Sequence, residues 1–294
     1  RSTLFPYTTL FRSQPLVLQD LSSLDLSSNC AAATIFARIK IVIAPVRHYS
    51  LAEQWQMPKL FAAQKLDLLH VPHFNAPVFT HCPKLVLTIH DLLWHQKKGL
   101  QMTTLSAWQY HLKHFFYLLV VKMAVKKAVL IITPSKISQK AINYFYPTVK
   151  NKVKVIYNGA ADFSHLKAKK PLLNLPHQYL LYVGSLYPHK NVDLLLQALR
   201  AQTLLNLVIV SARDAFWKKL KKQISQYQLS DRVYFLGKVS DEQLKYLYQH
   251  TQALVQPSLS EGFGLTGIEA LSLGTKVLAS QIPIFSEIYG QARG

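Results

Sequence analysis

The chain has 294 residues, half of them apolar, and its mean hydropathy is slightly positive. These values exclude a disordered chain and suit two α/β domains or one large one. Thirty-four lysines and arginines against fourteen acidic residues give a formal charge of +20, which favours an anionic partner such as nucleic acid, an acidic membrane leaflet or a phosphorylated small molecule.

The chain opens on R-S-T-L-F-P-Y-T-T-L-F-R-S, residues 1–13, which looks like the translation of a sequencing-adaptor oligonucleotide. We treat this segment as an artefact and leave it out of the fold prediction. The natural N-terminus, upstream of Gln14, is then expected to be missing.

Short β-branched runs alternate with longer amphipathic runs after this segment, which predicts βαβ units and a mostly parallel sheet. The strands predicted in the first half are Ile39 to Ala44, Leu66 to His70, Leu85 to Ile89, Val129 to Thr133 and Val153 to Tyr157.

Membrane-spanning segments are not predicted, because no stretch reaches roughly 18 uninterrupted apolar residues. The nearest candidate, F-F-Y-L-L-V-V from Phe115, stops at Lys122 and predicts a buried or interfacial helix. The two cysteines, Cys30 and Cys82, form no Cys-x-x-C motif, and small buried side chains are their simpler interpretation. They indicate a reducing compartment with neither a disulfide framework nor a zinc site.

A polar stretch containing lysine and proline, from Asn158 to Gln178, interrupts the alternation and predicts a domain linker. We therefore expect an N-terminal Rossmann-like domain over residues 14–165 and a C-terminal one over residues 166–294. The strands predicted in the second domain are Tyr179 to Val183, Leu207 to Val210, Val233 to Leu236, Ala253 to Gln256 and Val277 to Ser280.

Helix signals also occur between the strands predicted in the second domain. Ser240 followed by Gln243 forms a capping box before D-E-Q-L-K-Y-L-Y, which predicts a helix there. In S-E-G-F-G-L, the glycines allow backbone N–H groups to face outward just before another helix begins, which predicts an anion or hydroxyl site. Glu261 would then lie on the loop and Glu269 about one turn into the helix.

Ligands of doubly wound sheets bind outside the carboxyl ends of the strands. Three groups of residues fall at such ends: His90 with Asp91, Gly184 to Lys190, and Pro257 to Gly264. Two carboxylates beside a cradle of N–H groups suit a ligand rich in hydroxyls and phosphate, such as a nucleotide sugar.

Two blocks carry a family resemblance: Y-V-G-S-L-Y-P-H-K-N-V-D-L-L-L-Q-A-L from Tyr182, and P-S-L-S-E-G-F-G-L-T-G-I-E-A-L-S-L-G-T-K-V-L-A-S from Pro257. They resemble the group 1 (family four) retaining glycosyltransferases of GT-B fold, and T-I-H-D-L, I-I-T-P-S and V-I-Y-N-G fit the same family. The resemblance implies an α/β architecture of two doubly wound, parallel-sheet domains. It also implies that both domains are incomplete. The N-terminal domain of the family opens with a strand that would lie upstream of Gln14, and the C-terminal domain continues beyond the helix that contains Glu287.

The resemblance implies a role for each matching residue. Glu269 matches the residue that binds the ribose hydroxyls of the donor nucleotide, and Glu261 matches the one near the transferred sugar. Lys190 matches the lysine that neutralises the diphosphate, and His90 matches the histidine beside the donor sugar. The donor would be held by Gly184, Ser185, Lys190, Glu261, Gly262, Phe263, Gly264 and Glu269.

One departure concerns the diphosphate. Many members of the family carry an arginine directly after the glycine at Gly184, where this chain has Ser185, so part of the diphosphate clamp is absent or supplied elsewhere. The departing diphosphate needs fixed donors, and a lysine with a helix N-terminus can supply them. The chain contains no Asp-x-Asp motif, so we expect a metal-independent reaction without a cofactor.

Taken singly, each residue also has a structural interpretation. Glu269 would be an acid favoured by the helix dipole, His90 a packed or capping histidine, and Lys190 a solvated lysine before a helix. Asp91 would cap a turn. Ser135 and Asn158 fit cap or turn roles as well as they fit a site.

We therefore expect a cytoplasmic, peripheral-membrane retaining glycosyltransferase at the inner face of the cell membrane. It would move a hexose, with mannose as the first guess, from a nucleotide diphosphate sugar to a glycan or lipid-linked acceptor. The stretch A-W-Q-Y-H-L-K-H-F-F-Y-L-L-V-V-K-M-A-V-K-K mixes aromatics with cations, and it predicts either a helix on an anionic leaflet or a core helix with a basic edge.

Two alternatives stay open at this point. One is a sugar-nucleotide epimerase of similar fold, or a binding protein that has lost catalysis. The other is a basic nucleic-acid-binding protein, which the charge allows. Since the cations are scattered and no helix-turn-helix, RNP or zinc-finger pattern occurs, we expect no nucleic-acid partner.

Overall fold

The computed structural model describes residues 42, 44, 46, 50–96, 106–212 and 216–290. The artefact assigned to residues 1–13 and most of the strand predicted from Ile39 to Ala44 lie outside the described residues. The chain divides into two compact units, one made of residues 1–88 and 119–130 and the other of residues 89–118 and 131–294. The domain boundary expected between residues 165 and 166 stays a prediction.

Among the described residues, the first sheet has four strands in the order β1-β2-β3-β4. Its strands are β1 (Leu69–Val71), β2 (Leu85–Thr88), β3 (Leu130–Thr133) and β4 (Val153–Val155). β1 pairs in parallel with β2, and β3 pairs in parallel with β4. The helices associated with these strands are α2 (Leu51–Ala63), α3 (Leu93–Gln96), α4 (Ala107–Lys127), α5 (Lys136–Phe145) and the 3-10 helix η4 (Pro147–Lys152).

In the part of the chain that the structure describes, the second sheet has five strands in the order β7-β6-β5-β8-β9, and every neighbouring pair is parallel. Its strands are β5 (Leu180–Val183), β6 (Leu207–Val210), β7 (Val233–Gly237), β8 (Ala253–Gln256) and β9 (Val277–Ala279). Its helices are η5 (Pro188–Lys190), α6 (Val192–Ala201), α7 (Trp217–Gln226), α8 (Asp241–His250), α9 (Leu265–Ser272) and α10 (Pro283–Tyr289).

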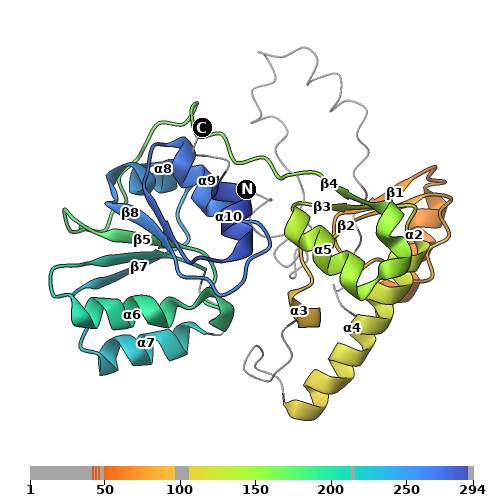
Figure 1. The fold of residues 1–294 in the computed structure, drawn as a ribbon, viewed down its shortest axis with the longest axis horizontal. Coiled ribbons are helices and arrows are strands. Elements are labelled where there is room, and N and C mark those ends of the chain that lie inside the picture. Colours follow the sequence, from red (N-terminus) through yellow and green to blue (C-terminus); the bar gives the residue numbers. More distant parts are fainter. Residues whose placement is uncertain are drawn as a thin grey trace. The chain divides into compact units, whose positions relative to one another are not determined.

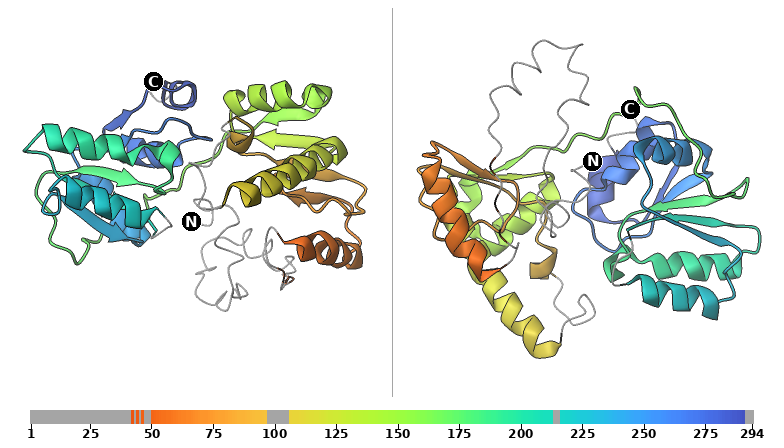
Figure 2. Two further views of the ribbon diagram at one scale, coloured as in Figure 1. Left: turned by 90° about the horizontal axis from the view of Figure 1, so that it is seen from below. Right: turned by 180° about the vertical axis from the view of Figure 1, so that it is seen from behind.

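The inner strands β6 and β8 of the second sheet are buried on both faces. Leu207 and Ile209 of β6 pack with residues of α6 and α7, whereas Val208 and Val210 pack on the other face with residues of α8. Figures 1 and 2 show α6 and α7 on one side of this sheet and α8 and α9 on the other. A parallel sheet covered on both faces requires apolar residues at consecutive positions, which explains the continuous run L-V-I-V in β6.

Most of the predicted strands are confirmed within one or two residues, and β6 and β8 have the predicted bounds. β1 begins three residues later than predicted, and β4 ends two residues earlier. The capping box is confirmed, since the Ser240 hydroxyl accepts a hydrogen bond from Gln243 N and the Gln243 side chain accepts one from Ser240 N. Ser135 caps α5 by accepting a hydrogen bond from Ser138 N, so its structural interpretation is confirmed.

Helix α4 contains the apolar run that begins at Phe115. No helix in the described part of the chain is both long enough and apolar enough to cross a membrane.

His95 of α3 is buried and fixed by two tyrosine hydroxyls. Its Nδ1 lies 2.7 Å from the Tyr117 hydroxyl, and its Nε2 lies 2.7 Å from the Tyr146 hydroxyl. A neutral imidazole carries one donor and one acceptor, so it can bond both hydroxyls at once. Burial, reinforced by the nearby His114, lowers the pKa of His95 to about 4.

This pKa predicts acid sensitivity. Between pH 6.5 and about 4, the unfolded chain binds a proton at residue 95 that the folded chain does not, so the free energy of unfolding falls as the pH falls through this range. The loss has a limiting slope of about 1.4 kcal/mol per pH unit. His95→Gln keeps one donor and one acceptor but does not titrate, so urea denaturation across this range should give a shallower slope.

The matched control is His177→Gln, at an exposed position. It should keep the slope of the unmodified chain. An unchanged slope in His95→Gln would contradict the prediction.

Candidate functional site

The position of β5 determines where a site can form. β5 pairs with β6 on one side and with β8 on the other, so the chain leaves the carboxyl ends of β5 and β8 toward opposite faces of the sheet. Such a switch point opens a crevice for ligands between the two loops. The loops that follow β5 and β8 contain the residues that the sequence singled out, Gly184 to Lys190 and Pro257 to Gly264.

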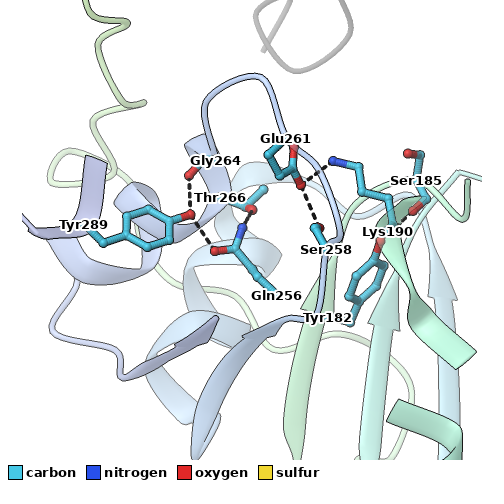
Figure 3. A network of polar contacts seen from close by, with 9 residues as sticks. All are labelled: Tyr182, Ser185, Lys190, Gln256, Ser258, Glu261, Gly264, Thr266 and Tyr289. Atoms are coloured by element: carbon cyan, nitrogen blue, oxygen red, sulfur yellow. Dashed lines mark hydrogen bonds and ion pairs between the residues drawn. The ribbon is translucent and has the colours of Figure 1, made fainter. Parts of the chain in front are cut away.

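Lys190 and Glu261 meet at this switch point, as Figure 3 shows. Lys190 Nζ lies 2.5 Å from Glu261 Oε1, and their side chains are only 20% and 12% exposed. The buried Ser258 hydroxyl donates a second hydrogen bond to the same oxygen, at 2.9 Å. The carboxylate is therefore held by a cation and a hydroxyl from two different loops.

Backbone contacts hold the two loops in register. Leu259 N, in the loop after β8, donates to His189 O, in the loop after β5, at 2.8 Å. The Tyr182 hydroxyl donates to Ser185 O at 2.5 Å, and Gly184 N donates to Val210 O of β6 at 3.0 Å. The loop that ends in Lys190 is thus tied to its own strand and to a neighbouring one.

The glycine-containing loop leads directly into α9. Gly264 is the N-cap of this helix and has a φ of 96°, a left-handed conformation that glycine adopts without strain. Phe263 is buried against Ile284, Phe285 and Ile288, so the loop is anchored by an aromatic side chain between two glycines.

Glu269 lies one turn into α9, as predicted, and is 2% exposed. Its Oε2 accepts a hydrogen bond from the Tyr248 hydroxyl of α8 at 2.9 Å. A buried carboxylate with a hydroxyl partner is held in a fixed orientation. It differs in this from a solvated acid that only interacts favourably with the helix dipole.

His90 and Asp91 follow β2 and lie beside the loop after β8. A Cβ added to Gly262 would lie 3.0 Å from Asp91 Oδ2 and 3.5 Å from His90 O, so the absence of a side chain at residue 262 permits this approach. The Ser138 hydroxyl of α5 donates to His90 O at 3.0 Å. A cavity of about 180 Å³ adjoins these residues and is lined by Asp91, Ser138 and Glu261 among others.

Asp91 combines a turn role with an unusual environment. Its Oδ1 accepts a hydrogen bond from Leu93 N at 3.1 Å, as the turn-capping interpretation requires. Burial raises the pKa of Asp91 above its ordinary value, and the charge of Glu261 adds to this effect, whereas the Leu93 N–H, His90 and Lys190 oppose it.

Lys190 and Glu261 are brought into direct contact, and Gly262 lies against the backbone of His90. Glu269 instead contacts Tyr248, and Ser185 is held through its backbone. Asn158 lies in the irregular segment after β4. Ser258 and Tyr289, which contact Glu261 and Gly264 respectively, had no individual role predicted from the sequence, although Ser258 lies within the range Pro257 to Gly264. The position of Ser258, three residues before Glu261, is a local signal for a contact between the two, but no local pattern indicates a role for Tyr289.

The arrangement offers fixed cationic and N–H donors beside two carboxylates. It can bind a ligand that carries both anionic oxygens and hydroxyl groups. Within the described residues, no three His, Cys, Asp or Glu side chains are grouped so that they could hold a metal ion.

Comparison with solved structures defines the class of fold. Sucrose-phosphate synthase from Thermosynechococcus elongatus is similar with a TM-score of 0.65 and 22% identity, over 81% of this chain and 63% of that one. WaaG, a glycosyltransferase involved in lipopolysaccharide biosynthesis, is similar with a TM-score of 0.61 and 16% identity, over 83% and 69%. Two parallel-sheet α/β domains of this kind form the GT-B fold, so the predicted fold class is confirmed.

Family models then identify the family. The model described as Glycosyl transferases group 1 matches residues 164–293, and the model described as Glycosyltransferase Family 4 matches residues 17–161. The chain belongs to the group 1 glycosyltransferases.

Curated relatives are similar over part of their length. The O-antigen chain mannosyltransferase RfbU of Salmonella typhimurium is 35% identical over 176 residues, which are 59% of this chain and 48% of the relative. The O-antigen biosynthesis glycosyltransferase WclY of Escherichia coli is 33% identical over 161 residues, 53% of this chain and 45% of the relative. The chain thus spans about half the length of these relatives.

The contact between Lys190 and Glu261 can be tested without any ligand. A double-mutant cycle of Lys190→Met and Glu261→Gln, measured by urea denaturation, should give a coupling free energy of about 1–2 kcal/mol, because both side chains are mostly shielded from water. A cycle of Lys218→Met with Glu261→Gln is the control, since Lys218 is exposed on α7. Equal coupling in the two cycles would refute the contact.

Proposed function

We propose that this chain is the donor-binding and catalytic part of a retaining hexosyltransferase, which moves mannose from a nucleotide diphosphate sugar to a glycan or lipid-linked acceptor. The observation that carries the proposal is the contact of Lys190 with Glu261 at the switch point, beside the N-terminus of α9. Membership of the group 1 glycosyltransferases supports the reaction class.

The chemistry of transfer explains the residue types. Breaking the bond between sugar and phosphate leaves positive charge on the sugar and negative charge on the departing diphosphate. Lys190 and the N–H groups at the start of α9 supply fixed positive charge to that diphosphate, and Glu261 faces the transferred sugar. One charge-assisted hydrogen bond from Lys190 contributes about 1.5–3 kcal/mol, roughly a ten- to hundredfold rate increase if it acts only in the transition state.

Glu269 binds the other end of the donor in this proposal. A buried carboxylate held by the Tyr248 hydroxyl is a fixed acceptor, which suits the ribose hydroxyls of the nucleotide. The two glutamates therefore bind opposite ends of one donor, while His90 lies beside the sugar.

Mannose and a polysaccharide acceptor are inferred from the relatives. The Salmonella relative is named an O-antigen chain mannosyltransferase, and the Escherichia coli relative is named an O-antigen biosynthesis glycosyltransferase. Both names support assembly of a surface polysaccharide, which also agrees with a cytoplasmic location where nucleotide sugars are made available.

Product analysis tests the reaction. The complete natural chain, incubated with GDP-mannose and a lipid-linked acceptor, should form a product whose anomeric configuration matches that of the donor, as NMR of the new linkage would reveal. Transfer should survive EDTA, because Lys190 and backbone donors neutralise the diphosphate. Activity that EDTA abolishes and manganese restores, or an inverted linkage, would contradict the mechanism.

The roles of the glutamates predict different defects. Glu269→Ala should weaken binding of the plain nucleoside diphosphate about tenfold or more, since one hydrogen-bonded charged group is lost. Glu261→Ala should leave that affinity nearly unchanged and depress transfer. Isothermal titration calorimetry with GDP distinguishes the two variants.

Glu242→Ala, on α8, serves as the control for loss of a carboxylate. Equal loss of GDP affinity in Glu261→Ala and Glu269→Ala would exclude this assignment of roles.

Helix α4 provides a candidate membrane-contacting face. Trp108 and Phe115 are 67% and 62% exposed, and Leu112 and Leu119 continue their stripe at spacings of three and four residues. The apolar side chains on this face are therefore exposed, as a helix at an interface requires. Its exposed lysines are Lys113, Lys122, Lys126 and Lys127.

Vesicle binding tests this face. The chain should cosediment with vesicles that contain phosphatidylglycerol more than with phosphatidylcholine vesicles, because each basic residue near an anionic surface contributes about 1 kcal/mol. Phe115→Ser should reduce the bound fraction, whereas Leu204→Ser, at a loop position that is 89% exposed, should not. Equal binding to both vesicle types would rule out the anionic surface as partner.

A further inference from the structure

Tyr289, the last residue of α10, reaches the start of α9. Its hydroxyl lies 2.8 Å from Gly264 O and 2.5 Å from Gln256 Oε1 (Figure 3). The Gln256 amide nitrogen is in turn 2.8 Å from Thr266 Oγ1. One side chain therefore connects the last residue of β8, the N-cap of α9 and, through Gln256, the first turn of α9.

The Tyr289 hydroxyl acts as a hydrogen-bond donor in these contacts. Burial raises the pKa of Tyr289, and the charge of Glu261 raises it further, so the hydroxyl keeps its proton at neutral pH. One proton serves one acceptor at a time. If the ends of the Gln256 amide are exchanged, Gln256 donates to Tyr289 while Tyr289 donates to Gly264 O, and every group has a partner.

Two glycines make room for the tyrosine. A Cβ at Gly264 or at Gly267 would overlap with the Tyr289 hydroxyl, and at Gly267 it would also lie 2.6 Å from Gln256 Oε1. Gly267 lies inside α9, where glycine ordinarily weakens a helix. The close approach of the Tyr289 hydroxyl explains why glycine occupies position 267 inside this helix.

The contacts of Tyr289 lie at both ends of the loop that contains Glu261 and at the start of the helix that contains Glu269. Gln256 ends the strand from which the Glu261 loop departs, and Gly264 begins the helix that carries Glu269. Any shift of Gly264 relative to Gln256 changes the course of residues 257–263 and the direction of the first N–H groups of α9.

We propose that Tyr289 is a positioning residue, which fixes the loop of Glu261 and the first turn of α9 in the geometry that binds the donor diphosphate. This inference rests on the proposed function, since it assigns Tyr289 a part in donor binding. Tyr289 itself contacts no reacting group, and it acts through Gly264, Gln256 and Thr266.

Tyr289→Phe removes the hydroxyl and keeps the ring, which stacks on Phe285 at 5.0 Å between centroids. Tyr144→Phe is the matched control, because Tyr144 is 80% exposed on α5. For the complete chain, the donor KM should rise and kcat should fall, so that kcat/KM drops about tenfold, as expected when a site loses one orienting hydrogen bond. The midpoint of thermal unfolding should stay close to that of the control.

Hydrogen exchange supplies a readout that needs no donor. Peptides that cover residues 257–268 should exchange faster in Tyr289→Phe than in Tyr144→Phe, while peptides from α6 should be unchanged. Kinetic constants and exchange rates both equal to those of the control would overturn the proposal. A lower unfolding midpoint with unchanged kcat and KM would also overturn it, because it would show that Tyr289 only stabilises the fold.

A second pair of variants tests the close approach itself. Gly267→Ala should accelerate exchange over residues 257–268 in the presence of Tyr289, and the smaller Tyr289→Leu should reduce this effect in the double variant. Additive effects of the two substitutions would contradict the assignment.

The proposed function can fail separately. If the unmodified complete chain neither binds GDP nor transfers mannose, the proposed function fails and Tyr289 has no part in donor binding. If the unmodified chain does both, the kinetic comparison decides the role of Tyr289 alone.

Discussion

The hydrogen bonding of β5 to parallel strands on both sides is the constraint on which the candidate site depends. Because β6 and β8 are its two neighbours, the loops after β5 and β8 diverge to opposite faces and leave a crevice at the carboxyl edge of the sheet. Lys190 enters this crevice from one loop and Glu261 from the other. The contact between the two residues therefore follows from this strand order.

Close packing determines how precisely the loops are placed. Gly262 allows the loop of His90 and Asp91 to approach, and Gly264 adopts a left-handed conformation. Gly264 and Gly267 also leave room for the Tyr289 side chain. Phe263, between two of these glycines, is buried with residues of α10. Helix α10 thus supports the loop both by apolar burial and by a hydrogen bond, which is how charged groups can be held at fixed positions beside a crevice.

The burial of the charged residues agrees with this arrangement. Glu261 and Lys190 are mostly shielded and paired, and Glu269 is buried with a tyrosine hydroxyl as its partner. Unpaired carboxylates would be costly at such depths, whereas paired ones are retained with fixed orientation. Proximity to Glu261 also contributes to the raised pKa of Asp91, so the charges of this region influence one another.

The GT-B fold class was predicted from the family resemblance. Sequence patterns alone predicted the alternation of strands and helices, the position of Glu261 on a loop and the position of Glu269 one turn into a helix. These features are local: apolar runs, glycines and capping residues act on neighbours within a few positions. The folded structure was needed to show that Lys190 contacts Glu261 and that Tyr289 is hydrogen-bonded to Gly264. Lys190 and Glu261 are 71 residues apart, and Tyr289 and Gly264 are 25 residues apart, so these contacts arise from strand order and helix packing, which no local pattern encodes.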